Sequence, residues 1–517
     1  MRLAAWLGRV VLVWLAVLGV VADARDFQLA DEARHANWRA VQKLVEQGVD
    51  VNVPEGDGTT ALHWAAYWDN AESADALIRA GARVSAANDL GVTPLWAACE
   101  NGSAAMVRRL LTAGASPNAA LLSGETLVMA AARTGQAEAV KELLVAGADV
   151  NAKERVRGQT ALMWAVAQQH ADVVGVLLAH GADVHARSSV YTEVVRTSGF
   201  GGGSAYNIEI QQGGYTPLLF AARAGHLASA TLLVAAGADV NDTAPYGTSA
   251  TVVAAHSGHG EVAAFLLDKG ADPNRDGAGY TALHAALLQK DEPLVKALLV
   301  HGANPNAPVL KPTPTRKDSI DFAFDPTQVG ATPFWLAARY SSPGSMRLLM
   351  QHGANPLFVH RPTYWAGNGR QVDEGDTTAL LAAAGIGGEA PALSVDHADR
   401  IAERARLEAQ RREPDPVAVE ALTLEAVTVA AEAGIDVNAA NADGNTALHA
   451  VAARGYDTVV KVLVEKGAGL DIKNKAGQTP LAAAIAKSIA GQARLRAAPL
   501  PPTSATVDLL RKLGAKE

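Results

Sequence analysis

Cysteine is almost absent from this chain of 517 residues, which contains one, Cys99. A single cysteine cannot form an intrachain disulfide, so packing alone has to stabilise the fold. Aromatic residues make up only 5% of the chain, and lysine and arginine form no long block. With a net charge of −8, the missing basic block argues against nucleic acid as the main partner.

Long apolar runs are also missing after the first residues. The run from Val10 to Val21 is broken only by Gly19 and follows a short basic stretch. The pattern Ala22-Asp23-Ala24 then offers two small residues at a cleavage site. This order is typical of a secretory signal peptide cleaved after Ala24. The apolar run of twelve residues is also too short to span a bilayer comfortably. The alternative is an uncleaved membrane anchor.

Export follows from this prediction. We expect a periplasmic protein of bacterial type, or an extracellular one, with no stable membrane insertion after cleavage. Without residues 1–24 the chain keeps 493 residues, with 43 basic against 52 acidic side chains and a net charge of −9. That length exceeds what one hydrophobic core supports, so several domains or a repeat array are expected.

Two short templates recur along the chain. Copies of the first include GTTALHWAA, GVTPLWAAC and GYTPLLFAA, and copies of the second include GADVN, GADPN and GVDVN. The Thr or Ser of the first template stands at 60, 93, 126, 160, 216, 249, 281, 332, 378, 446 and 479, and six of the ten intervals are 32 to 34 residues. A period near 33 that carries both templates resembles the ankyrin repeat.

The resemblance implies an all-α solenoid of about twelve helix-turn-helix units, with β-hairpin fingers along one edge. The residue types agree with this fold. Thr93 is suited to cap a helix N-terminus, Pro94 to the first helical position, and Gly102 and Gly114 to left-handed helix ends. One helix pair cannot bury both of its faces alone, so neighbouring pairs have to stack.

Four long intervals contain insertions, and three of these enlarge fingers. The first, SSVYTEVVRTSGFGGGSAYNIEIQQGG, predicts a long hairpin with a glycine-rich tip. It is not a phosphate loop, because no strand leads directly into a helix and no Gly-Lys-Ser/Thr follows. The second is proline-rich, and the third carries Phe358, Tyr364 and Trp365. The fourth separates two helices of one repeat and contains DHADRIAERARLEAQRRE, a charged helix expected to be solvated.

These boundaries divide the chain into nine segments. In order they are the signal peptide 1–24, repeats one to five at 25–187, the enlarged finger 188–213, repeats six to eight at 214–307, the proline-rich finger 308–329, repeat nine at 330–357, the third finger insertion 358–375, repeat ten at 376–444 with its charged insertion at about 385–417, and repeats eleven and twelve with the C-terminal cap at 445–517.

Catalytic patterns fail when each is compared with its required context. The stretch GIGGEA at 385–390 follows a helix instead of a strand, so it indicates a turn. His256 and His259 in HSGHGE suit packing or capping better than a metal site. In the resembled family the positions of His63, His284 and His449 are structural. Cys99 has no cationic neighbour in the sequence to activate it as a nucleophile. A free thiol that is sensitive to oxidation remains an alternative role for it. We predict no enzyme, cofactor or metal.

Protein binding is the function that the resemblance implies. In ankyrin proteins the two residues after the Ala-Ala pair line a concave groove, together with the finger tips. Carried over by position, the predicted partner-binding residues are Tyr67, Trp68, Glu100, Arg133, Thr134, Gln168, Arg223, His256, Gln289, Arg339 and Tyr340. Trp64, Trp96 and Trp335 are expected to pack between repeats, and Trp68 fits either role.

The leading hypothesis is a monomeric, exported, non-catalytic scaffold that binds a partner protein. It places the grip between repeats five and ten, with Arg339 and Tyr340 as anchors. Two alternatives remain. One is a small-ligand-binding or enzyme-associated subunit with a pocket under the first two finger insertions. The other is a secreted effector acting on a host protein.

Overall fold

The computed structural model describes residues 24–197, 206–313, 324, 326–365, 371–373, 375–386, 415–486 and 505–516. The predicted signal peptide, apart from Ala24, lies outside the described residues. So do the glycine-rich hairpin tip and the charged helix of the fourth insertion. The chain forms two compact units: residues 1–190 with 213–239, and residues 191–212 with 240–517.

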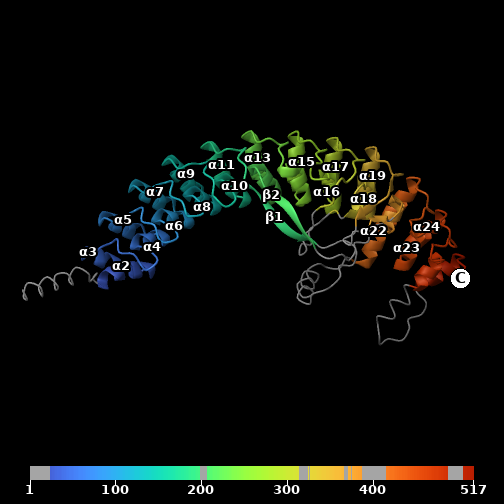
Figure 1. The fold of residues 1–517 in the computed structure, drawn as a ribbon, viewed down its shortest axis with the longest axis horizontal. Helices are drawn as coiled ribbons and strands as arrows, with labels where there is room; N and C mark the ends of the chain where they lie inside the picture. The colour runs from blue at the N-terminus through green and yellow to red at the C-terminus, as the bar shows by residue number, and fades with distance from the viewer. Residues whose placement is uncertain are drawn as a thin grey trace, which may run out of the picture. The chain divides into compact units, whose positions relative to one another are not determined.

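The first unit contains six helix pairs among its described residues, in chain order (Figure 1). They are α2 (Ala24–Arg34) with α3 (Trp38–Glu46), α4 (Ala61–Tyr67) with α5 (Ala71–Arg79), α6 (Pro94–Asn101) with α7 (Ala104–Thr112), α8 (Leu127–Arg133) with α9 (Ala137–Val145), α10 (Ala161–Ala167) with α11 (Ala171–Ala179), and α12 (Pro217–Ala224) with α13 (Leu227–Ala235). First helices pack on neighbouring first helices, and second helices on second helices.

The second unit repeats this arrangement. Its pairs are α14 (Ala250–His256) with α15 (Gly260–Asp268), α16 (Ala282–Gln289) with α17 (Glu292–Val300), α18 (Pro333–Arg339) with α19 (Pro343–Gln351), α20 (Ala379–Ala383) with α22 (Pro416–Glu432), α23 (Ala447–Arg454) with α24 (Asp457–Glu465), and helical residues 480–486 with α26 (Ala505–Lys512). The predicted all-α solenoid of about twelve pairs is confirmed. Within the described residues, no helix has the length and apolar character needed to cross a membrane.

Helix ends lie where the sequence places them. The Thr93 hydroxyl accepts a hydrogen bond from the Trp96 amide, and Pro94 opens α6. Gly102 and Gly114 follow helices with φ of 71° and 93°, the left-handed region that glycine enters without strain. Gln169 adopts φ of 63° at the turn where most repeats have glycine. Gln169 therefore replaces the glycine within an unchanged turn.

Small side chains bring the helices together. In α4, Ala61, Ala65 and Ala66 are buried with Leu62, and later first helices bury a similar set of alanines with leucine, or with valine in α14. Alanine leaves room for close helix approach, so leucine and valine from adjacent pairs complete the core. Only neighbouring pairs share this burial, which is why repetition is required for stability.

An asparagine from the second template bridges successive repeats. Asn151 donates from Nδ2 to the Gly181 carbonyl (3.1 Å) and accepts at Oδ1 from the Asp183 amide (2.8 Å). The same two-bond bridge forms at Asn52, Asn118, Asn241, Asn274, Asn306 and Asn438. The recurring final letter of GADVN is thus a connection between neighbours, a role that the sequence pattern alone does not show.

Strands occur in the finger insertions. β1 (Val190–Thr197) pairs with β2 (Tyr206–Gly213), which confirms the long hairpin. In the third insertion β4 (Thr363–Trp365) pairs with β5 (Gln371–Asp373). At its base, β3 (Val359–His360) pairs with β6 (Thr377–Thr378), which directly follows the insertion. The glycine-rich stretch therefore joins two paired strands, and the phosphate-loop interpretation stays excluded.

The second, proline-rich insertion is anchored at its base. The Thr313 amide donates to the Phe324 carbonyl (2.9 Å), and the Phe324 amide donates to the Thr313 hydroxyl (3.1 Å). The Phe324 ring is fully buried, with its centroid 4.9 Å from that of Tyr280 and 6.2 Å from that of His284. A side chain of the insertion thus fills the space beside α16, followed by the short helix η3 (Pro326–Gln328).

Candidate partner-binding surface

The predicted partner-binding residues lie at the carboxyl ends of the first helices. In the first unit Tyr67, Trp68, Glu100, Arg133, Gln168 and Arg223 are exposed, and Thr134 is half-buried. In the second unit all four predicted residues are half-buried: His256, Gln289, Arg339 and Tyr340. Among the predicted partner-binding residues, the exposed side chains therefore all lie in the first unit.

An aromatic cluster formed by Arg34, Glu55, Trp64, Tyr67 and Trp68 covers the end of α4. The Trp64 and Tyr67 rings lie 5.8 Å apart at 86°, and the Tyr67 and Trp68 rings 5.2 Å apart at 85°. Both are edge-to-face contacts, the geometry that aromatic quadrupoles favour. The Arg34 guanidinium lies 5.9 Å from the Trp64 ring centroid. The Trp64 indole donates to the Glu55 carboxylate at 2.9 Å, which fixes the ring.

The outer rings of this cluster remain accessible. Tyr67 is 48% exposed and Trp68 50% exposed. The Trp68 indole also donates to the Arg34 carbonyl (3.1 Å), so this tryptophan both connects two repeats and presents a face to solvent. Trp96 and Trp335 are buried and Trp64 is half-buried, as expected for packing side chains.

The next predicted positions carry an ion pair between repeats. The Arg133 guanidinium bonds the Glu100 carboxylate. Both side chains are more than a third exposed, so the pair contributes little to stability. Burial raises the pKa of the neighbouring Glu125 carboxyl, and the charge of Arg133 opposes that rise. Arg133 and Glu100 therefore contribute one positive and one negative charge to the surface at the ends of the first helices.

Several predicted residues have structural partners. The Gln289 amide donates to the His256 carbonyl (2.6 Å), and the Thr134 hydroxyl to the Cys99 carbonyl (3.4 Å). Asn101 caps the end of α4 in the same way, through the Ala66 carbonyl. The last carbonyls of a helix have no partner within it, and here the next repeat supplies the donor. Sequence reasoning missed this role because it depends on which side chain reaches across the stack.

In the second unit the predicted anchors also have intramolecular contacts. Gln328 donates to the Tyr340 hydroxyl oxygen at 2.9 Å. The Tyr280 hydroxyl lies 3.3 Å from Nδ1 of His256. Partner binding through Arg339 and Tyr340 stays a prediction.

Cys99 is not on the surface. It is fully buried in α6, and burial raises the pKa of its thiol far above the ordinary value. A protonated, inaccessible thiol is a poor nucleophile and a poor target for oxidants. The structure gives no support to a redox role for this cysteine.

The template histidines hold the helix starts. His63 accepts from the Thr60 amide at Nδ1 (3.0 Å), and its Nε2 lies 3.0 Å from the Val92 carbonyl of the next repeat. His284 and His449 make the same bonds. This geometry requires the neutral imidazole. Across the described residues, no group of three or more His, Cys, Asp and Glu is placed to hold a metal ion.

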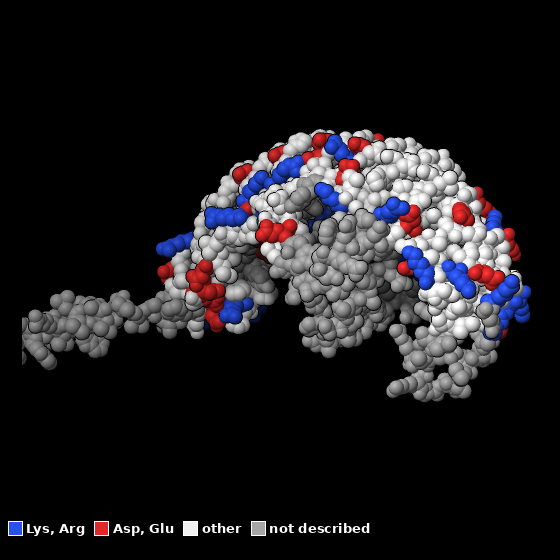
Figure 2. Space-filling view, turned by 45° about the vertical axis from the view of Figure 1, so that its right-hand side comes forward, with Lys and Arg blue, Asp and Glu red and all other residues white. Residues whose placement is uncertain are grey.

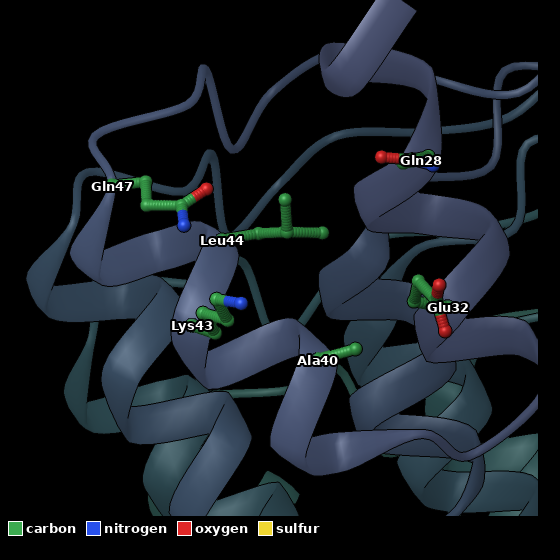
Figure 3. A pocket seen from close by; sticks show the side chains of 6 residues that line it. All are labelled: Gln28, Glu32, Ala40, Lys43, Leu44 and Gln47. Carbon is green, nitrogen blue, oxygen red and sulfur yellow. The ribbon is translucent and has the colours of Figure 1, made fainter.

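A shallow hollow of about 410 Å³ lies between α2 and α3, as Figure 3 shows. Leu44 and Ala40 of α3 face α2 across it, and the remaining side chains are polar. Its lining is Gln28, Glu32, Ala40, Lys43, Leu44 and Gln47. A polar outer face is what a terminal repeat needs for solubility, so the hollow is explained without a ligand.

Comparison with known families decides the identity of the fold. The model for ankyrin repeats in three copies matches residues 29–120, 116–188, 218–309 and 417–494, and the single-repeat model matches 329–361. The chain belongs to the ankyrin-repeat family. Over 50 residues this ankyrin-repeat chain is 40% identical to ankyrin repeat-containing protein P1E11.10 of Schizosaccharomyces pombe, spanning 10% of the chain and 24% of that relative.

A solved structure is also similar. The human ASB11 ankyrin repeat domain shares 25% identity with this ankyrin-repeat chain and aligns with a TM-score of 0.37. The alignment covers 54% of this chain and 98% of that domain.

Ankyrin repeats generally mediate protein–protein interaction, and proteins built from them are typically non-catalytic. The relevant property of this ankyrin-repeat chain is therefore its accessible surface. On the face shown in Figure 2, acidic and basic side chains are interspersed among large uncharged areas.

Proposed function

We propose that this protein is an exported, non-catalytic scaffold that binds a partner protein through the ends of its first helices and its fingers. The observation that carries the proposal is the pair of half-exposed rings, Tyr67 and Trp68, held edge to face on α4. Tryptophan, tyrosine and arginine are the residues most enriched at binding hot spots.

The cluster is preorganised for binding. Trp64 is fixed by Glu55, and Trp68 by the Arg34 carbonyl, so few rotamers remain to be frozen when a partner docks. Aromatic side chains also bury a large area with only two rotatable bonds each. The rings therefore offer binding energy at a small entropic cost.

Export is the second part of the proposal. It rests on the sequence of residues 1–24, where a basic start, a twelve-residue apolar run and a small-residue cleavage pattern follow in order. A lone buried cysteine is compatible with an oxidising compartment, since no thiol is available for unwanted pairing. A bacterial periplasm is the compartment we favour.

Affinity capture from periplasmic extract tests the binding role. The intact chain is compared with Tyr67→Ala and with Val145→Ala, a smaller truncation of an exposed apolar residue at the end of α9. Arg339→Ala/Tyr340→Ala serves as a third bait. Circular dichroism melting confirms that each variant is folded.

The expected result is one protein that the intact chain and Val145→Ala retain and that Tyr67→Ala binds at least about tenfold more weakly, the scale of a hot spot. If Arg339→Ala/Tyr340→Ala alone removes the partner, binding lies in the second unit and our choice of anchor is wrong. Equal retention by all baits contradicts a specific surface at any of these positions.

A further inference from the structure

Three finger tips of the first unit, and the base of the enlarged finger that follows them, expose apolar side chains in successive repeats. Leu90, Leu122 and Val156 are 70%, 76% and 72% exposed, and Val190 at the start of β1 is 51% exposed. We call these four residues the finger row. Their spacing of 32, 34 and 34 residues follows the repeat period, so each stands in the next finger along the stack.

Adjacent fingers are linked through their backbones. The Asp89 amide donates to the Asp57 carbonyl (2.9 Å), and the Arg155 amide to the Ser123 carbonyl (2.9 Å). The Ser189 amide donates to the Arg157 carbonyl (2.7 Å). Backbone hydrogen bonds thus join the fingers of Leu122, Val156 and Val190 to one another, and the finger of Leu90 to the preceding finger at Asp57.

Individual tips are also rigid. The buried carboxylate of Glu154 accepts hydrogen bonds from the amides of Val156, Arg157 and Gln159. Asn88 plays the same part in its finger, accepting from the amides of Leu90 and Val92. Rigid presentation lowers the entropy lost on binding.

Folding does not require these apolar side chains. Turn tips favour Gly, Asn, Asp and Ser, because those residues suit tight backbone geometry and contact water. At about three-quarters exposure Leu122 and Val156 bury little area within the chain. A registered series of exposed apolar side chains on one edge is the kind of surface that marks an interaction site.

The charge of the finger edge changes sign along the row. Exposed Asp57 and Asp89 stand at the amino-terminal end, and the Thr59 amide holds the pKa of Asp57 below its ordinary value. Exposed Arg155 and Arg157 flank Val156 at the other end. Opposite charges on a partner would set its direction along the fingers.

We propose that the finger row binds an extended segment of another protein, with several apolar side chains, basic residues at one end and acidic residues at the other. The basic end lies toward Asp57 and Asp89, and the acidic end toward Arg155 and Arg157. This inference rests on the proposed protein-binding function and adds the finger residues that bind and the chemistry of the bound segment.

Selection from a random peptide library displayed on phage tests the inference with a defined probe. The full chain is the target, and Leu122→Asp/Val156→Asp is used for counter-selection. We expect enriched peptides to carry spaced apolar residues between a basic end and an acidic end. Each synthesised peptide should bind Leu122→Asp/Val156→Asp at least about tenfold more weakly than the intact chain.

The matched control is Val145→Asp. Val145 and Val156 are both valines with 72% exposure in the same unit, and Val145 ends a second helix instead of a finger. Val145→Asp should leave peptide affinity unchanged. Thermal melts of all variants should agree, because none of the substituted side chains is buried.

A charge exchange tests the direction of binding. Arg155→Glu/Arg157→Glu should weaken the selected peptides at least about tenfold, and peptides whose acidic end is changed to lysine should recover that loss. Failure of this recovery, or undiminished binding by Leu122→Asp/Val156→Asp, would overturn the inference.

Two other occupants are checked directly. Sedimentation velocity reports self-association, and flotation with phosphatidylcholine vesicles reports lipid binding. Self-association of the intact chain that is lost in Leu122→Asp/Val156→Asp would show that the finger row binds a second copy of the chain. Vesicle binding lost in the same variant would show that it binds a membrane surface. If Tyr67→Ala abolishes partner capture and the finger-row variant does not, the scaffold function stands and only this inference fails.

Discussion

Single polar side chains carry the connections from repeat to repeat. Each bridging asparagine supplies one donor and one acceptor to the following turn, and each template histidine reaches from its own helix start to the next repeat's backbone. The histidine bonds are buried or half-buried, and an unpaired buried backbone group costs free energy, so the histidines stabilise the stack where no secondary structure does. The asparagine bridges add exposed hydrogen bonds between the same neighbours.

The buried histidine His284 predicts a pH dependence. Burial lowers its pKa from 6.5 to about 4. Because the unfolded chain binds this proton first as the pH falls, stability is present above pH 6.5 and is lost between 6.5 and about 4. The loss should be on the order of 3 kcal/mol.

Urea unfolding at several pH values between 7 and 4 measures this slope. His284→Leu, which places there the residue found at the same position in α12 and α20, should flatten the slope while lowering stability at pH 7. An unchanged slope in His284→Leu would show that other groups cause the acid sensitivity.

A bridging asparagine predicts a local energetic effect. Asn151→Ala removes two exposed hydrogen bonds between neighbouring turns, and with them the side chain that fixes these two turns to each other at this point. The free energy of unfolding should fall by about 1–2 kcal/mol, measured by urea titration. Lys141→Ala, an exposed change on α9, is the control and should shift it by less than about 0.5 kcal/mol.

Some of the residues that connect repeats or form the candidate surface can be predicted from the sequence, and others cannot. Tyr67 and Trp68 follow from their position after the Ala-Ala pair, and the histidines from their template. The donor role of Gln289 and the anchoring of Tyr340 by Gln328 depend on contacts between different segments. No local pattern encodes those contacts.

At the scale of elements, helix starts and finger lengths are readable because local chemistry sets them. Thr at the cap, Pro at the first position and a left-handed Gly at the end locate α6, and interval counting locates each insertion. The burial of Phe324 against Tyr280 and the pairing of β3 with β6 cannot be predicted from the sequence, because each contact joins residues that are far apart along the chain.

The hairpin predicts tolerance to shortening. Removing residues 197–208, the tip and its immediate flanks, takes no residue from any helix pair. The melting temperature should change by less than about 2 °C, because a projecting tip contributes little burial between repeats. A large drop, followed by circular dichroism, would show that this finger stabilises the array.

The whole molecule behaves as a series of neighbour contacts. In the first unit α6 packs against α4 and α8, and α7 against α9. Deleting residues 93–125 removes one complete unit and allows its neighbours to stack on each other. The shortened chain should keep a cooperative helical melt, with a somewhat lower midpoint. Complete loss of helical signal would contradict a nearest-neighbour solenoid.

The central claim is that an exported scaffold grips a partner protein at the end of α4. The most direct measurement is photo-crosslinking in living cells, with a benzophenone amino acid at position 67 and, for comparison, at position 145. The account predicts one discrete protein adduct from position 67, formed in the periplasm, and none from position 145. Absence of any adduct at position 67, or the same adducts at both positions, would contradict it.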